Sequence, residues 1–207
     1  MLRDDILYLL ESDYLQAVGF LKNKYGACKY DYFYNENCAS ENAKAQRSSE
    51  GIFLHHIDED KYMNLSSRKI AKQYPYAAQR AEKLVYCNYL EHLLLHIKIF
   101  ENYLAGKCKQ PATNGIFLFI VPELNTFYCT NQFQKNYNKA YGEVIKDNFE
   151  EYLLILKRFL KISKPKFLDD EVKRRRKCYG ATKTEYLCRD SFGNISPKIQ
   201  AALKRVF

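Results

Sequence analysis

Apolar residues recur at helical spacing near both ends of the chain. Near the N-terminus they are Ile6, Leu7, Leu10, Tyr14, Leu15, Val18 and Leu21. This spacing predicts one or two helices over residues 1–26, with Asp13 placed to cap the second and Gly26 placed to end it. The same spacing over residues 142–162 predicts a single long helix. Ser196 and Pro197 predict the start of a final short helix.

The middle of the chain has a different pattern, that of two short strands followed by a helix. Residues 51–57, GIFLHHI, are β-branched and aromatic between a glycine and three acidic residues, which predicts a strand. Residues 84–87 predict a second, shorter strand. Asn88 and Glu91 have the spacing of a capping box, so a helix should begin at Asn88 and reach about Leu104. The polar connection over residues 58–82 should contain a helical insert around residues 66–73.

Two further segments are aromatic or apolar. Tyr30, Tyr32 and Tyr34 alternate in a segment that predicts a strand or a turn, where packing into the core is favoured over stacking on bases. Residues 116–121 predict a buried helix or strand that Pro122 should limit. The fold class is therefore α+β and mainly helical. The segments are an N-terminal helical part with a polar loop (1–50), the strand-strand-helix core (51–105), a helical scaffold (106–165) and a basic C-terminal part (166–207).

Composition narrows the class of protein. The chain has 207 residues, lacks any apolar run of 18 or more, and begins Met-Leu-Arg-Asp-Asp, which is not the layout of a signal peptide. We therefore expect a cytoplasmic protein with no membrane partner. Seven cysteines without a CxxC pair favour reduced thiols over a disulfide framework, although a zinc site built from distant cysteines is also compatible.

Positive charge is concentrated near the C-terminus. The formal net charge is +9, and the densest basic run is Lys173, Arg174, Arg175, Arg176 and Lys177. Such a run is the electrostatic footprint of nucleic-acid binding, and a solvated charged face is its simpler interpretation. The charge alone does not decide between them.

All four histidines fall in the strand-strand-helix region. His55 and His56 are adjacent in the first strand and should point to opposite faces, whereas His92 and His96 lie one turn apart on one face of the helix. Either pair alone is compatible with ordinary, partly buried side chains. Both pairs together favour a catalytic metal site, since three imidazoles with an open position are typical of one.

This order of motifs resembles the ββα-metal finger of HNH endonucleases, in particular the phage-type and colicin-type branch. The resemblance covers residues 55–100. It implies that His55, His92 and His96 bind one divalent metal and that His56 is the general base that accepts a proton from water. Imidazole ligands suit Zn, Ni, Co or Mn better than Mg, although an open site completed by oxygen ligands also accepts Mg.

One position departs from the family pattern. The family often has asparagine just before the second strand, where it braces the base, and this chain has Lys83. Asn64 or Asn88 could supply the brace. Three acidic residues near the histidines in sequence could support the imidazoles, or could equally be solvated loop and cap residues: Asp58, Asp60 and Glu91.

The sequence therefore predicts a metal-dependent HNH endonuclease that hydrolyses phosphodiester bonds in DNA, in restriction, phage defence or a mobile element. The preference for DNA comes from the resemblance alone. Three alternatives stay open: an RNA-cleaving nuclease or toxin with the same site, a non-catalytic nucleic-acid-binding protein held by structural zinc, and a module that binds an acidic protein. A homodimer is compatible with cleavage at symmetric sites, but no dimer signal is visible.

Overall fold

The computed structural model describes residues 2–133, 139–163 and 187–204. The chain begins with two helices, α1 (Leu2–Glu11) and α2 (Tyr14–Tyr25). Asp13 caps α2 in a complete capping box with Gln16, and Gly26 ends the helix with a φ of 82°. The predictions for this region are confirmed. A positive φ at Gly26 carries no steric cost, which explains why the helix stops there.

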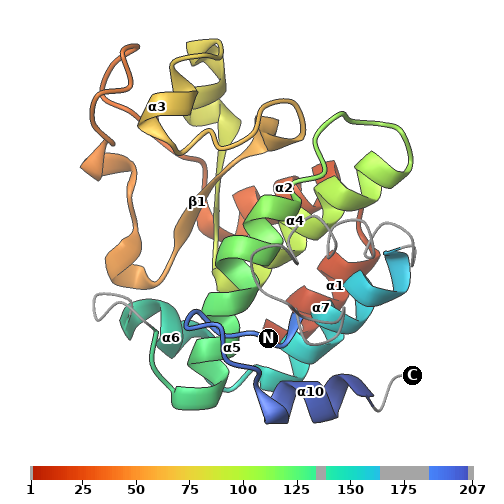
Figure 1. Ribbon diagram of the computed structural model, residues 1–207. Helices are drawn as coiled ribbons and strands as arrows, with labels where there is room; N and C mark the ends of the chain where they lie inside the picture. The colour runs from red at the N-terminus through yellow and green to blue at the C-terminus, as the bar shows by residue number, and fades with distance from the viewer. Residues whose placement is uncertain (1, 134–138, 164–186, 205–207) are drawn as a thin grey trace.

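A two-stranded antiparallel sheet and a long helix follow. Strands β1 (Phe53–His56) and β2 (Leu84–Cys87) pair with His55 opposite Val85 and His56 opposite Leu84. Only Asn88, the predicted cap, separates β2 from helix α4 (Tyr89–Leu104). The Asn88 side chain accepts hydrogen bonds from the backbone N–H groups of Leu90 and Glu91. Figure 1 shows β1 beside the N-terminal part of α4.

Short elements fill the connections around the sheet. Before β1 lie the 3-10 helices η1 (Ala43–Ala45) and η2 (Ser48–Glu50), and between the strands lie η3 (Ile57–Asp60), α3 (Arg68–Ala71), η4 (Tyr76–Gln79) and η5 (Ala81–Lys83). Helix α3 occupies the middle of the predicted insert. Of the alternating tyrosines, Tyr32 is buried in the core, as favoured, while Tyr30 and Tyr34 are exposed.

Two predictions for the second half of the chain are wrong. Pro122 does not limit the apolar run, because the π-helix η6 (Gly115–Ile120) continues into α5 (Val121–Thr130) and proline is tolerated in a first helical turn. The single helix over 142–162 is two, α6 (Lys139–Ile145) and α7 (Phe149–Ile162). The carbonyl of Ile145 accepts hydrogen bonds from the Tyr128 hydroxyl and the Asn148 N–H, which close a turn between these helices.

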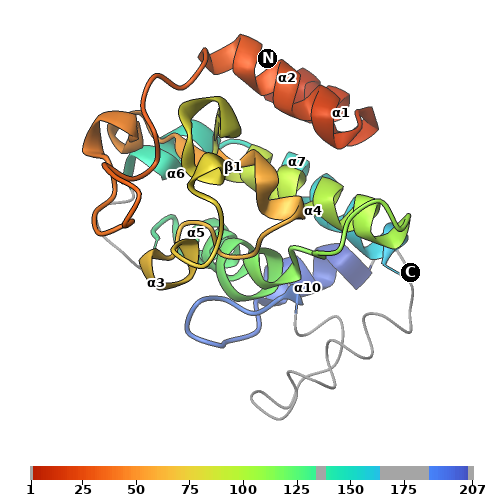
Figure 2. The ribbon, with the colours of Figure 1, turned by 90° about the horizontal axis from the view of Figure 1, so that it is seen from above.

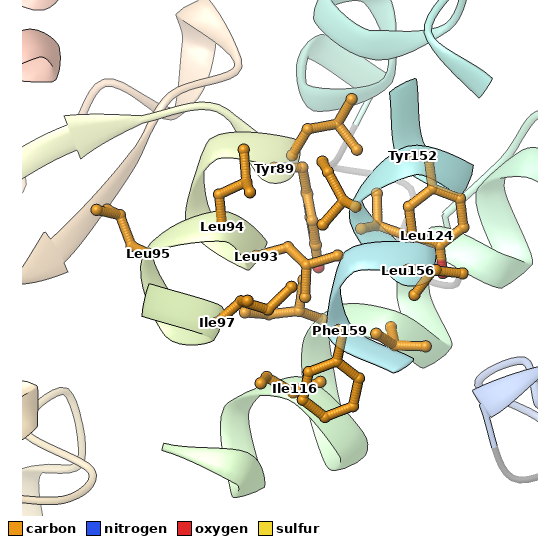
Figure 3. Close-up of a cluster of buried hydrophobic side chains, with 14 of the residues drawn as sticks. Tyr89, Leu93, Leu94, Leu95, Ile97, Ile116, Leu124, Tyr152, Leu156 and Phe159 are labelled. Carbon is orange, nitrogen blue, oxygen red and sulfur yellow. The ribbon is translucent and has the colours of Figure 1, made fainter. Parts of the chain in front are cut away.

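Helix α4 lies at the centre of the molecule. Figure 2 shows α1 and α2 along one side of it and α5 and α10 (Pro197–Lys204) on the other. In Figure 3, apolar side chains of α4 face those of α7 and of the η6–α5 segment; they include Leu93, Ile97, Ile116, Leu124, Leu156 and Phe159. Burial of α4 on all these sides fixes its position, and with it the positions of His92 and His96.

The structure is therefore mainly helical with one small antiparallel sheet. No helix in the described residues is long and apolar enough to cross a membrane. The cysteines in the described residues are free thiols, in agreement with the sequence.

Candidate metal centre

Three of the four histidines meet at the junction of β1 and α4. His55, His92 and His96 each offer one ring nitrogen, and these three atoms lie within 4.8 Å of one another. His55 is 1% exposed and His96 is 5% exposed. The predicted cluster is therefore assembled and shielded from bulk water.

The two helix histidines have the spacing of metal ligands. Nε2 of His92 lies 3.2 Å from Nε2 of His96. Two nitrogens bound to one tetrahedral zinc at about 2.0–2.1 Å would be about 3.3 Å apart. The spacing of four residues on α4 produces this approach, because both side chains leave the same face one turn apart.

The tautomer of His55 follows from its neighbour Tyr14 on α2. The Tyr14 hydroxyl donates its proton to the carbonyl of Ile57 at 2.8 Å. Its oxygen therefore accepts from Nε2 of His55, 3.0 Å away, and Nε2 must carry hydrogen. Nδ1 of His55 then keeps its lone pair, and this atom is buried without a hydrogen-bond partner. A buried nitrogen lone pair without a hydrogen-bond donor, beside two other imidazoles, is suited to bind a cation.

His96 is held in a similar way from the other side of the site. Its Nδ1 donates to the carbonyl of Ala112 at 3.3 Å, which leaves the lone pair on Nε2. A Cβ on Gly115 would lie only 2.4 Å from the His96 ring, so the absence of a side chain there makes room for the imidazole. Oε2 of Glu59 lies 3.4 Å from Nε2 of His96, and burial raises the pKa of this carboxyl to about 8, so it keeps its proton at pH 7.

Aromatic packing orients His92. Its ring stacks on Phe53 of β1, with centroids 5.6 Å apart, and Phe53 in turn stacks on Tyr141 of α6. The strand and two helices therefore restrict the rotation of this imidazole.

His56 has a separate set of partners, as expected for a neighbour on the opposite face of the strand. Its Nε2 lies 2.8 Å from Oε1 of Gln79, which can only accept, so Nε2 carries hydrogen and Nδ1 keeps a lone pair. The Gln79 amide is fixed in turn because its Nε2 donates to the carbonyl of Leu65 at 3.1 Å. The ring of Tyr32 packs against His56 with centroids 4.4 Å apart.

Burial keeps all four imidazoles neutral. Loss of hydration lowers the pKa of His56 and of His96 to about 4, and it lowers the pKa of His55 and of His92 well below the usual 6.5. The neighbouring imidazoles push the pKa of His55 down further. Neutral rings are the form that binds a metal or accepts a proton.

His56, His92 and His96 line one cavity of about 790 Å³. One wall comes from the segment between the strands and includes Glu59, Met63, Asn64, Ser66, Ser67 and Ile70. A second group of lining residues comes from the segment that precedes and enters the π-helix, and it includes Gln110, Thr113, Asn114 and Phe119. The candidate base and two of the three candidate ligands therefore open onto the same space.

Lysines pair with one of the residues predicted to support the histidines. The Asp58 carboxylate lies 2.7 Å from Lys61 and 3.4 Å from Lys83, and its charge tends to raise the pKa of His56 against the larger effect of burial. Asn64 lines the cavity in a left-handed conformation with a φ of 56°.

Asn88 and Glu91 have the capping role that their spacing predicted. Oε2 of Glu91 accepts from the Asn88 N–H at 2.8 Å at the start of α4. Glu91 is completely buried and pairs with Lys24 and with the Tyr25 hydroxyl. The side chains that contact the histidines through polar atoms are those of Tyr14, Glu59 and Gln79, and the sequence interpretation gave none of them a role at the site.

The basic run Lys173–Lys177 lies outside the described residues, so the structure does not place it relative to the cavity. Comparison with protein-family models, curated protein sequences and solved structures gives no match for this chain.

Proposed function

We propose that this protein is a metal-dependent endonuclease of the HNH type that hydrolyses phosphodiester bonds in DNA. The observation that carries the proposal is one arrangement: a three-histidine cluster on a strand-strand-helix unit, and a fourth histidine with a fixed tautomer on the same cavity. Separation of a metal cluster from a neutral base is what hydrolysis by an activated water requires.

The role of His56 follows from its hydrogen bonds. Gln79 holds the proton on Nε2, so Nδ1 is the atom that would remove a proton from water. The imidazole is neutral at pH 7 because burial lowers its pKa to about 4. Tyr32 and the Gln79–Leu65 hydrogen bond keep the ring from turning, which fixes the direction of attack.

The three remaining histidines would hold one divalent ion through Nδ1 of His55 and Nε2 of His96, with His92 as the third ligand. Such an ion supplies charge stabilisation to the phosphate oxygens and to the leaving oxygen. Mg, Mn, Zn, Co and Ni remain the candidate metals, and the imidazole donors favour the last four. Oε2 of Glu59 lies 3.4 Å from Nε2 of His96, the atom that would hold the ion, so this carboxyl borders the proposed metal position.

The positive charge of the chain supports nucleic acid as the substrate. The whole chain carries a formal net charge of +9, and Lys173, Arg174, Arg175, Arg176 and Lys177 are the proposed contacts for phosphates. DNA rather than RNA rests on the family resemblance described above.

Cleavage assays with a metal series test this proposal. The protein would be freed of metal with EDTA and then incubated with supercoiled plasmid and labelled RNA, in EDTA or with Mg, Mn, Zn, Co or Ni added singly. We expect nicking of the plasmid with at least one metal and none in EDTA. Binding of nucleic acid without cleavage by any metal would instead favour the zinc-stabilised binding protein, and cleavage of RNA alone would exclude DNA as substrate.

A further inference from the structure

We propose that the cavity receives one unpaired nucleotide, so that the enzyme cleaves strands that are single or locally unpaired rather than intact duplex. This inference rests on the proposed nuclease function and adds the form of its substrate. The geometry points to it through three features of the cavity: its depth, the chemistry of its walls, and the exposed aromatic side chain beside it.

The depth of the site is the first feature. The candidate base His56 is 1% exposed, and His96 is 5% exposed, so a phosphate must enter the cavity to reach them. A volume of about 790 Å³ lies within the range of roughly 300–1,000 Å³ that accommodates single small molecules. A nucleotide has such a size, whereas a base-paired helix does not. Enzymes with enclosed sites act on single strands or on nucleotides turned out of the helix.

The walls of the cavity suit a nucleobase. The lining includes side chains that can both donate and accept hydrogen bonds: Asn64, Ser66, Ser67, Gln110, Thr113 and Asn114. Base edges present the same mixture of donors and acceptors. Among the described residues, the lining contains neither lysine nor arginine. The walls are therefore better matched to an uncharged base than to several phosphates.

Phe119 supplies a surface for stacking. Its side chain lines the cavity and yet is 62% exposed, and Met63, which also lines the cavity, is 44% exposed. Phe119 belongs to the π-helix, in which Ile116, Phe117 and Ile120 are buried. π-helical turns are rare and occur frequently at functional sites. Here the turn anchors three apolar side chains in the core while it leaves Phe119 beside the opening.

Three exposed cations are adjacent in sequence to residues of the cavity lining. Arg68 and Lys69 are exposed on α3, between the lining residues Ser67 and Ile70, and Lys109 is exposed next to the lining residue Gln110. Their positive charge is available to the phosphates of a strand whose base enters the cavity.

Binding without cleavage tests the inference independently of activity. In EDTA, wild-type protein would be titrated by fluorescence anisotropy into a labelled single strand, the same sequence as a blunt duplex, and a duplex with one bulged nucleotide, each as DNA and as RNA. We expect the single strand and the bulge to bind at least about 10-fold more tightly than the duplex. Phe119→Ala should weaken single-strand binding by about 5- to 150-fold, the loss expected for one stacked base.

Phe192→Ala is the matched control, because Phe192 is 63% exposed and does not line the cavity. This variant should bind all strands like wild type. Equal binding of duplex and single strand, or unchanged binding by Phe119→Ala, would overturn the inference. Efficient cleavage of blunt duplex with added metal would also overturn it while leaving the nuclease function intact, whereas no binding to any nucleic acid would overturn both.

Discussion

The Tyr14 hydroxyl accepts a hydrogen bond from Nε2 of His55 at 3.0 Å while it donates its own proton to the Ile57 carbonyl. A helix from the start of the chain thus determines which nitrogen of a strand histidine is free to bind metal. Tyr14 is 3% exposed, so water does not compete for these hydrogen bonds.

Removal of the Tyr14 hydroxyl should therefore weaken metal binding. We expect Tyr14→Phe to lose about 10- to 100-fold in affinity for zinc, because Nε2 of His55 is left buried without an acceptor. Isothermal titration with zinc measures the change. Tyr8→Phe is the control, since Tyr8 is 49% exposed on α1 and should bind zinc like wild type. Equal affinities for wild type and Tyr14→Phe would remove Tyr14 from the site.

Gln79 should affect the reaction without affecting the metal. Gln79→Ala frees the His56 ring to rotate and to change tautomer, so we expect kcat to fall by about 10- to 100-fold, a part of what a general base contributes. Metal content and KM should stay close to wild type. Gln73→Ala changes an exposed glutamine nearby and should leave the rate unchanged. A fall in metal content in Gln79→Ala would show that Gln79 supports the cluster instead.

Little free space remains between the His96 ring and Gly115. A Cβ at Gly115 would lie 2.4 Å from Cε1 and 2.6 Å from Nδ1 of the imidazole, so Gly115→Ala should displace the ring and lower metal affinity at least about 10-fold. Gly19→Ala is the control, because apart from its chain neighbours and the backbone of its own helix no atom lies within 4 Å of the added carbon, and α2 should gain about 0.5–1 kcal/mol. Melting temperatures with and without zinc separate the two effects, since only Gly115→Ala should lose the stabilisation by metal.

Stability should depend on pH through the buried histidines. Burial lowers the pKa of His56 to about 4, so between about pH 6.5 and 4 the unfolded chain binds a proton that the folded chain does not. The free energy of unfolding must then fall as the pH falls through this range. His56→Gln should make the free energy of unfolding depend less steeply on pH in this range. Urea denaturation in EDTA at several pH values measures this dependence.

The buried Glu59 should make stability depend on pH in the opposite direction. Burial raises its pKa to about 8 from an ordinary value of 4.5, so between these values the folded chain holds a proton that the unfolded chain has lost. The free energy of unfolding therefore falls as the pH rises through this range. Glu59→Gln should remove this contribution. The two variants should change the slope of the free energy of unfolding against pH in opposite directions. A change in the same direction for Glu59→Gln and His56→Gln would contradict the assigned protonation states.

The local features of the core could be predicted from the sequence. Asn88 and Glu91 are three residues apart, and this short-range signal located the start of α4 correctly. His92 and His96 were placed on one face because the helical period fixes their relation. The break between α6 and α7 was missed because it depends on Tyr128, which donates to the Ile145 carbonyl from another helix.

The partners of the histidines are long-range and could not be read from the pattern. Tyr14 is 41 residues from His55, and it looked like one more apolar position of an amphipathic helix. Gln79 lies 23 residues from His56 in a polar connection with no periodic signal. Two of the acidic residues chosen by proximity in sequence, Asp58 and Glu91, pair with lysines instead.

His56 is proposed to act as the general base, whereas His55, His92 and His96 are proposed to hold the metal. The most direct measurement compares His56→Ala and His96→Ala for bound metal per chain and for the rate of DNA cleavage. We expect His56→Ala to keep one metal while its cleavage rate falls by about 10²- to 10⁴-fold, and His96→Ala to lose both metal and cleavage. Loss of metal from His56→Ala, or cleavage by it at the wild-type rate, would contradict the account.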